Sequence, residues 1–262
     1  MAREVLITGA ASGIGLELAK RFAFAGDNLI LLDIDPKIEG IKKDICSFFN
    51  VQATSHVVDV SKHKEIFKVK DFLYSKKVDV IINNAGIGYN GEIADMSIIE
   101  CLKLVEVNLM GPFNVINIFL PDMIREKSGH IVNVSSGQTF FKLPTWGAYA
   151  ATKAALGVLS EVLTFELKKH NIGVTTVYPF MVNTKFHECT DPNGTLMARL
   201  AKKLLPLYSD QPEYLAELIF DAVQSGKKVE NVSVLNTVAK LINATTVGYN
   251  MLGTITSKFL VK

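Results

Sequence analysis

The chain of 262 residues has a mass of 28.8 kDa, and its 48% hydrophobic and 21% charged side chains exclude intrinsic disorder, collagen-like repeats and low-complexity architecture. The 28 basic and 26 acidic side chains leave a net charge of +2, which is too small to recruit a nucleic-acid backbone. We therefore expect a folded protein that does not bind nucleic acid.

Short β-branched runs alternate with stretches of helical length from the first residues onward. We predict strands at residues 5–8, 28–32, 55–60, 78–83, 130–135, 174–178 and 232–235. We predict helices at residues 14–25, 36–49, 62–74, 98–125, 149–169 and 212–224. This alternation predicts parallel strands joined by crossover helices, and the apolar strands predict helices on both faces of the sheet. The expected fold is a single α/β domain over residues 1–262, with a doubly wound parallel sheet of about seven strands.

Two segments break this pattern. Residues 183–211 contain polar turns, and a long excursion of this kind commonly forms a lid or specificity loop, so we expect a substrate loop there. Residues 226–262 carry five lysines and one glutamate. Three roles stay open for this extension: structure packed beside the substrate, an oligomerisation arm, or a helix on a membrane surface.

Three glycines stand at the turn from the first strand into the first helix, in the run from Thr8 to Gly15. Glycine permits tight backbone angles and close approach of a ligand, while the N–H groups and positive dipole end of a helix favour a pyrophosphate. A turn in this position is typical of a Rossmann-type dinucleotide site. We expect the cofactor to contact Gly9, Ser12, Gly13, Ile14 and Gly15.

Asp33 closes the second predicted strand. A carboxylate there accepts hydrogen bonds from the 2′-OH of the adenosine ribose and repels a 2′-phosphate. No arginine or lysine occurs at residues 10–12 or at Ile34. We therefore favour NAD over NADP as cofactor; the alternative is that Asp33 only caps the helix that starts near Pro36.

Tyr149 and Lys153 stand four residues apart in a predicted helix, so both side chains emerge on one face. An ammonium together with a cationic nicotinamide would supply the roughly 4 kcal/mol needed to lower the pKa of a tyrosine to about 7. Ser136 follows a predicted strand at the carboxyl edge of the sheet, where open α/β folds bind ligands. We expect the hydroxyls of Ser136 and Tyr149 to meet over one carbonyl group.

Seven motifs in this order make residues 4–225 similar to the short-chain dehydrogenase/reductase family, in its shorter single-domain branch. The motifs are Thr8-Gly-x-x-x-Gly-Ile-Gly15, Asp59-Val60, Asn83-Asn84-Ala85-Gly86, Asn108, Ser135-Ser136, Tyr149-x-x-x-Lys153 and Pro179. The resemblance implies that Tyr149 is the general acid/base and that Ser136 orients the substrate oxygen. It also implies that Lys153 binds the nicotinamide ribose and lowers the pKa of Tyr149, and that Asn108 completes a water-linked proton relay.

The resemblance also implies the surroundings of the cofactor. Asp59 and Val60 would line the adenine pocket, and Thr184 would form a hydrogen bond with the carboxamide of the nicotinamide. The remaining cofactor contacts would come from Asn84, Ala85, Gly86, Tyr149, Lys153, Pro179 and Val182. One departure from the family pattern is Phe180, where family members usually carry glycine. We therefore expect the site to have a different shape around the nicotinamide end of the cofactor.

Apolar residues cluster around the site motifs and predict an apolar substrate wall, with ordinary core packing as the alternative for each. They are Phe140, Phe141, Leu143, Trp146, Phe180, Met181 and Phe186. The expected function is hydride transfer between the cofactor and a fairly apolar secondary alcohol or ketone. A catalytically silent NAD-sensing protein would need only the glycine turn and Asp33, and stays as the alternative.

Spacing argues against three other classes of enzyme. Sugar-nucleotide epimerases usually have Gly-x-x-Gly-x-x-Gly, and enoyl reductases usually have a longer spacing from tyrosine to lysine. No Gly-x-Ser-x-Gly elbow of a hydrolase occurs, and the histidines show no zinc-ligand spacing, so we expect no metal.

The predicted helices at residues 98–125 and 149–169 are apolar nearly all round, which predicts burial on two sides. Family members commonly pair through these helices, so the resemblance implies a homodimer or homotetramer; burial beneath the tail is the alternative. We see no signal peptide or spanning segment, and the three scattered cysteines fit a reducing compartment. We therefore expect a cytoplasmic protein whose partner is a small-molecule alcohol or ketone.

Overall fold

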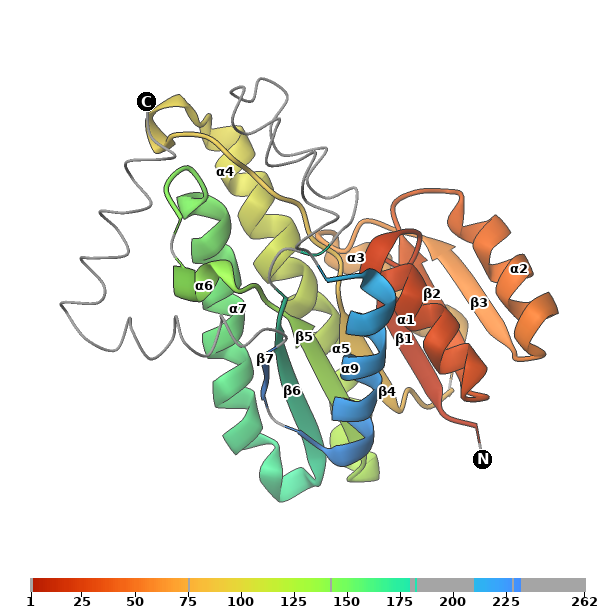
Figure 1. Cartoon of the computed structure of the whole chain (residues 1–262). Coiled ribbons are helices and arrows are strands. Elements are labelled where there is room, and N and C mark those ends of the chain that lie inside the picture. Colours follow the sequence, from red (N-terminus) through yellow and green to blue (C-terminus); the bar gives the residue numbers. More distant parts are fainter. Residues whose placement is uncertain are drawn as a thin grey trace.

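A parallel sheet with helices on both faces forms the frame of the molecule (Figure 1). The computed structural model describes residues 2–74, 76–141, 143–179, 182, 210–227 and 229–231. In that part of the chain the sheet has seven strands in the order β3-β2-β1-β4-β5-β6-β7, and all neighbours are parallel. The strands are β1 (Glu4–Thr8), β2 (Asn28–Asp33), β3 (Ala53–Val57), β4 (Val80–Asn83), β5 (Gly129–Val134), β6 (Ile172–Tyr178) and β7 (Val229–Asn231). The predicted single-domain, doubly wound α/β fold is confirmed.

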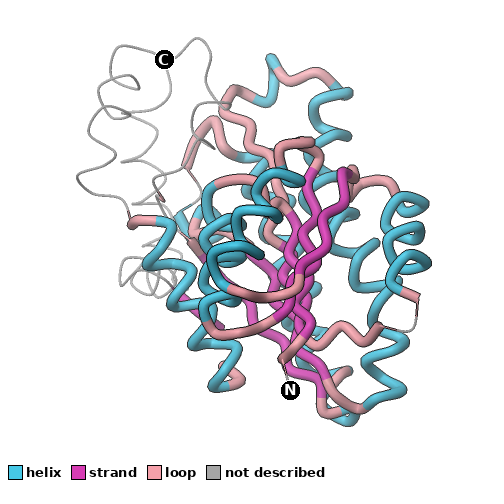
Figure 2. Tube along the Cα trace, turned by 90° about the vertical axis from the view of Figure 1, so that its right-hand side faces the viewer, coloured by secondary structure: helices cyan, strands magenta, loops and turns pink. Residues whose placement is uncertain are grey.

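Helices cover both faces of the sheet (Figure 2). One face carries α1 (Gly13–Phe24), α2 (Ile38–Phe49) and α9 (Pro212–Ser225). The other carries α3 (His63–Leu73), α5 (Gly111–Glu126) and α7 (Gly147–Glu166). Within β1, Val5 and Ile7 pack toward the first face and Leu6 toward the second, and all three side chains are fully buried. Burial on both faces explains why the strand is apolar at successive positions.

Shorter elements complete the described chain. They are η1 (Ile93–Asp95), α4 (Ile98–Val105), η2 (Glu106–Met110), α6 (Gln138–Phe141) and η3 (Lys168–His170). The strand predicted at residues 55–60 ends earlier, at Val57, because its neighbour β2 ends at the paired residue Asp33. The strand predicted at 232–235, residues 183–209 of the loop predicted at 183–211, and most of the tail at 226–262 lie outside the described residues.

The helix predicted at residues 98–125 is interrupted by the π-helical turn η2 between α4 and α5. Pro112 explains the interruption. In an α-helix the N–H of residue 112 would donate to the carbonyl of Asn108, and proline has no N–H. By length and composition alone, the segment Ile98–Glu126 could cross a membrane. However, α5 packs against β4 and β5, so we interpret the segment as a core helix of the domain.

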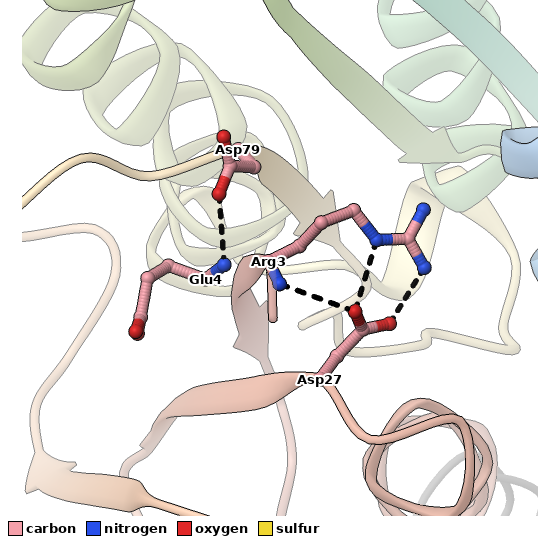
Figure 3. A network of polar contacts seen from close by, with 4 residues as sticks. All are labelled: Arg3, Glu4, Asp27 and Asp79. Atoms are coloured by element: carbon pink, nitrogen blue, oxygen red, sulfur yellow. Dashed lines mark hydrogen bonds and ion pairs between the residues drawn. The ribbon is translucent and has the colours of Figure 1, made fainter. Parts of the chain in front are cut away.

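Arg3 and Glu4 hold the amino end of the central strand β1 (Figure 3). The Nε and Nη2 atoms of Arg3 donate to the two carboxylate oxygens of Asp27 at 3.0 and 2.6 Å. The backbone N–H of Glu4 donates to Asp79 Oδ2 at 2.9 Å. Asp27 and Asp79 directly precede β2 and β4, so these bonds join the amino ends of three neighbouring strands.

Candidate active site

A cleft of about 740 Å³ lies over the carboxyl ends of the strands, around the β1–β4 pair. The strand order reverses at this pair, because β2 and β3 lie on one side of β1 and the later strands lie on the other. Open α/β sheets bind ligands at such a reversal. The predicted site residues that line the cleft are Gly9, Ser12, Gly13, Ile14, Asp33, Asp59, Val60, Asn84, Ala85, Gly86, Ser136, Tyr149, Lys153, Pro179 and Val182.

The glycine turn between β1 and α1 is closely packed. Gly9 and Gly13 have φ angles of 67° and 53°, in the left-handed region that favours glycine. A Cβ on Gly15 would lie 2.0 Å from the Gly9 carbonyl oxygen, so Gly15 packs beneath the turn and does not line the cleft. The first turn of α1 contains no acidic residue that would neutralise its positive end. The turn therefore fits a pyrophosphate group.

The end of β4 holds this turn in place. Thr8 Oγ1 accepts hydrogen bonds from the backbone N–H groups of Asn84 and Ala85, both at 3.0 Å. In return, Asn84 Nδ2 donates to the carbonyl oxygens of Thr8 and Gly9 at 3.0 and 3.2 Å. Next to it, Asn83 Nδ2 donates to Asn133 Oδ1 at 2.8 Å, across to β5. The predicted asparagine motif thus ties three central strands together beside the cleft.

Asp33 lies at the end of β2 with its carboxylate held by two backbone groups. Its Oδ2 accepts from the N–H of Ala11 at 2.8 Å, and its Oδ1 accepts from the N–H of Asp35 at 2.9 Å. The N–H of Lys37, the residue before α2, donates instead to Asp35 Oδ1 at 3.0 Å. Asp33 is therefore not the cap of α2; it borders the glycine turn and faces the cleft.

Asp59 and Val60 follow β3 and line the same end of the cleft as Asp33. Asp59 Oδ1 accepts from the N–H of Ser61 at 2.9 Å, and its own N–H donates to Glu65 Oε2 at 2.8 Å. Sequence reasoning missed several further lining residues, which come from the chain after β2, the chain after β3 and the segment from α4 to η2. They are Ile34, Val58, Glu100, Lys103, Leu104 and Val107.

Asn108 is fully buried in the π-helical turn and stands behind the cleft rather than in its lining. Its Oδ1 accepts from the N–H of Ile87 at 2.9 Å, and its Nδ2 donates to the Ile87 carbonyl at 2.9 Å and to Thr152 Oγ1 at 3.1 Å. Thr152 in turn donates to the Tyr149 carbonyl at 2.8 Å. The Asn108 side chain therefore links the loop after β4 to α7.

Ser136 and Tyr149 meet in the cleft, as the sequence predicts. Their exposed fractions are 7% and 6%, both residues line the cleft, and Ser136 is close enough to lower the pKa of Tyr149. Ser136 Oγ also accepts from the N–H of Gln138 at 3.2 Å. The ring of Trp146 packs edge-on against Tyr149, with ring centroids 5.6 Å apart. The two hydroxyls are thus placed to hold one substrate oxygen.

Lys153 lies one helical turn beyond Tyr149 on α7 and is buried. Its Nζ donates to the Val134 carbonyl at 2.9 Å, and its own carbonyl accepts from Ser135 Oγ at 2.8 Å. A Cβ on Gly86 would lie 3.2 Å from Lys153 Nζ, so Gly86 allows the ammonium to approach the cleft. These contacts fix α7 against the end of β5.

Burial dominates the electrostatics of this pair in the protein alone, whereas the sequence expectation includes a cationic nicotinamide. Burial raises the pKa of Tyr149 to about 12, against a smaller lowering by the hydrogen bond with Ser136. Burial also lowers the pKa of Lys153 to about 8. Removal from water disfavours both charged forms, and in the protein alone this effect exceeds the attraction between an ammonium and a phenolate. The expected low pKa of Tyr149 therefore requires further positive charge in the cleft.

Only one of the described residues predicted to form the apolar substrate wall lines the cleft. Trp146 lines the cleft, whereas Phe140 packs against Tyr178 with ring centroids 4.8 Å apart. Phe141 and Leu143 are absent from the lining among the described residues. Phe180, Met181, Thr184 and Phe186 lie outside the described residues. Sequence reasoning missed Ile87, Gly88, Tyr89 and Gln138, which line the cleft after β4 and β5; their positions just beyond predicted strand ends were the available signal.

Comparison with known proteins gives a match of residues 3–193 to the family model described as short chain dehydrogenase. Dehydrogenase/reductase SDR family member 7B of Mus musculus is 33% identical over 238 residues, which cover 87% of this chain and 72% of that protein. Oxidoreductase UcpA of Escherichia coli K12 is 36% identical over 189 residues, which cover 71% of this chain and 72% of that protein.

Solved structures show the same fold. A short chain dehydrogenase/reductase from Burkholderia phymatum in complex with NAD has a TM-score of 0.83 and 23% identity, with 95% of each chain covered. A short-chain dehydrogenase from Sphingobium yanoikuyae in complex with NADPH has a TM-score of 0.78 and 24% identity, with 92% of this chain and 93% of that chain covered.

Proposed function

Since the chain belongs to the short-chain dehydrogenase family and is an oxidoreductase, we propose that it transfers a hydride between a nicotinamide dinucleotide and a secondary alcohol or ketone. One observation carries this proposal: Ser136 and Tyr149 line the same cleft, both nearly buried, and Tyr149 stands one helical turn from buried Lys153. When bound, the nicotinamide supplies the hydride acceptor or donor.

Tyr149 exchanges the proton of the substrate oxygen. In ketone reduction its phenol donates a proton to the oxygen as the carbonyl becomes an alcohol, and in alcohol oxidation the phenolate takes that proton back. Ser136 holds the same oxygen in place. Because Ser136 Oγ accepts from the Gln138 N–H, its own proton stays available for the substrate oxygen or the phenol.

Lys153 and Asn108 support the proton transfer. The Lys153 ammonium favours the phenolate of Tyr149 by its charge, and its bond to the Val134 carbonyl fixes its position. The side chain of Asn108 is occupied by Ile87 and Thr152. We therefore assign the role in a water-linked relay to the backbone carbonyl of Asn108. In a regular α-helix the N–H four residues later would donate to this carbonyl, but that residue is Pro112, which has no N–H.

We further propose NAD as the cofactor, with the Asp33 carboxylate accepting from the ribose 2′-OH and repelling a 2′-phosphate. Both dinucleotides should be assayed by absorbance against secondary alcohols, hydroxysteroids, 3-hydroxyacyl thioesters and sugars. We expect turnover with at least one secondary alcohol, and kcat/KM at least about tenfold higher with NAD than with NADP, because a 2′-phosphate beside a carboxylate costs over 1 kcal/mol.

Asp33→Ser should reduce this preference, whereas Asp35→Ser, which removes an acid outside the cleft lining, should preserve it. An equal preference in the wild type and Asp33→Ser would remove Asp33 from cofactor selection. Tight NAD binding without turnover of any alcohol or ketone would instead favour the NAD-sensing alternative.

We also propose a homo-oligomer that pairs through α4, α5 and α7. These helices keep large apolar side chains exposed, among them Leu102, Phe113, Val158 and Phe165. Sedimentation velocity should show a dimer or tetramer, and Phe165→Asp should shift it toward the monomer because a charge would be buried in the interface. Phe48→Asp, at an equally exposed phenylalanine on α2, should leave the assembly unchanged. Identical sedimentation of the wild type and Phe165→Asp would exclude this interface.

A further inference from the structure

A threonine in an unfavourable backbone conformation stands just before the helix that carries Tyr149. Thr145 has a φ of 68°, in the left-handed region that β-branched residues rarely adopt. It is the third residue of a β-turn, which the N–H of Trp146 closes by donating to the Leu143 carbonyl at 3.2 Å. With Pro144 second and a positive φ third, the turn has the features of type II, which favours glycine or asparagine at the third position. Strain of this kind is often found at functional sites.

The polar groups of Thr145 hold a second loop, which follows β4. The Thr145 hydroxyl donates to Asn90 Oδ1 and shares its proton with the carbonyl of residue 144. The Thr145 carbonyl accepts from the N–H of Gly91 at 2.9 Å. The other end of the loop is fixed at Ile87 by its two hydrogen bonds with Asn108. We call the contacts of Thr145 with Asn90 and Gly91 the loop clasp.

Both segments that the loop clasp joins carry an aromatic residue of the cleft lining. Tyr89 lies in the loop and packs over Gly91, where an added Cβ would lie 2.8 Å from the Tyr89 hydroxyl oxygen. Trp146 ends the β-turn, and its ring packs edge-on against Tyr149. Because Thr145 directly precedes Trp146, its backbone conformation sets the direction in which this ring leaves the chain. The loop clasp therefore connects two walls of the cleft beside the proton-exchanging group.

We propose that Thr145 is a positioning residue, which holds the Trp146 ring against Tyr149 through the loop clasp as a fixed wall beside the reacting oxygen. The hydrogen bonds to the loop offset the unfavourable φ of Thr145, so the turn keeps its conformation while the loop is attached. The effect on turnover rests on the hydride transfer proposed above, whereas the placement of the ring does not depend on it.

Trp146 is the only tryptophan of the chain, so its fluorescence reports on this wall alone. Acrylamide should quench it more strongly in Thr145→Val, which removes the hydroxyl at similar volume, because the ring loses its fixed contact with Tyr149. Asn90→Ala removes the same bond from the other side, so it should raise quenching equally, and the double variant should exceed neither single one. Thr145→Ser keeps the hydroxyl and should resemble the wild type. Thr164→Val, which removes a hydroxyl bond on α7 outside the cleft lining, is the matched control and should also resemble the wild type.

Turnover is the second measurement, with NAD and the secondary alcohol that reacts fastest in the assay described above. In Thr145→Val and Asn90→Ala, kcat should fall at least about tenfold, because a displaced wall misorients the substrate against Tyr149. NAD affinity should stay within about threefold of the wild type, since the loop clasp contacts neither the glycine turn nor Asp33 and binding needs no proton transfer.

Three results would overturn the inference. Equal quenching in the wild type and both single variants would show that the ring is held without the loop clasp. Additive effects of the two substitutions would show that they act on separate interactions. A lower free energy of unfolding in urea, with quenching and kcat unchanged, would make Thr145 a structural residue only. A wild type that oxidises no alcohol would refute the proposed function, and the quenching of the variants would still decide whether Thr145 positions the ring.

Discussion

Replacing Tyr149 by phenylalanine should lower kcat/KM by about 10²- to 10⁴-fold, the usual contribution of a positioned general acid or base. The change removes only the phenol oxygen, and Ser136 keeps its bond from the Gln138 N–H. The ring stays, so its packing against Trp146 and the fold should be retained. Steady-state kinetics measure the loss, and fluorescence titration with NADH should show an affinity within about threefold of the wild type, since binding does not need proton transfer.

Tyr178→Phe is a matched control for this substitution. Tyr178 is also buried, and burial raises its pKa to about 12 as it does for Tyr149. It ends β6 outside the cleft lining, so Tyr178→Phe should keep most of the activity. Wild-type turnover by Tyr149→Phe, or equal losses in the two variants, would contradict the assignment of Tyr149 as the proton-exchanging group.

The second large effect is expected at Gly15, where even alanine should reduce dinucleotide affinity by about 100-fold, because losing one or two hydrogen bonds to a charged pyrophosphate costs about 3 kcal/mol. The new Cβ would lie 2.0 Å from the Gly9 carbonyl oxygen and 2.7 Å from Asn84 Nδ2. The turn must therefore move away from α1, and the bonds from Asn84 to Thr8 and Gly9 must change with it. Calorimetric titration with NAD measures the affinity, and urea unfolding measures the accompanying loss of stability.

Gly40→Ala makes the same chemical change in open space. Gly40 lies within α2, and a Cβ there meets no atom within 4 Å. Alanine favours helix at such a position, so the variant should bind NAD normally and be equally or slightly more stable. Normal NAD affinity in Gly15→Ala would show that the turn tolerates the displacement and is not the pyrophosphate site.

The strands and the cleft side chains could be predicted because they depend on local patterns. Continuous apolar runs marked the strands, and the glycine turn, Ser136 and Tyr149 follow them at the carboxyl edge. The π-helical turn was missed because the apolar periodicity continues through it. Pro112, which cannot donate a helical hydrogen bond, was the signal for it in the sequence. Gln138 was missed although it stands just beyond a predicted strand end; its burial depends on the packing of α6 beside the cleft, which the spacing of residues along the chain does not show.

The pKa of Tyr149 illustrates a second limit of sequence reasoning. The four-residue spacing correctly places Lys153 on the same helix face, and it favours a lowered pKa. Desolvation depends on the whole cleft and has the opposite sign, raising the pKa of Tyr149 to about 12. In the protein alone Tyr149 is therefore protonated at neutral pH, the form that donates a proton in ketone reduction.

The two hydrogen bonds that Asp33 accepts have a consequence for engineering the chain. Its carboxylate accepts hydrogen bonds from the Ala11 and Asp35 amides, so it stabilises the loop in addition to the role in cofactor selection that we propose for it. A redesign toward the phosphorylated coenzyme that exchanges this residue alone would release both amides and loosen the loop. A variant that uses the phosphorylated coenzyme must therefore provide a new hydrogen-bond acceptor for the Ala11 N–H together with the new cationic side chain.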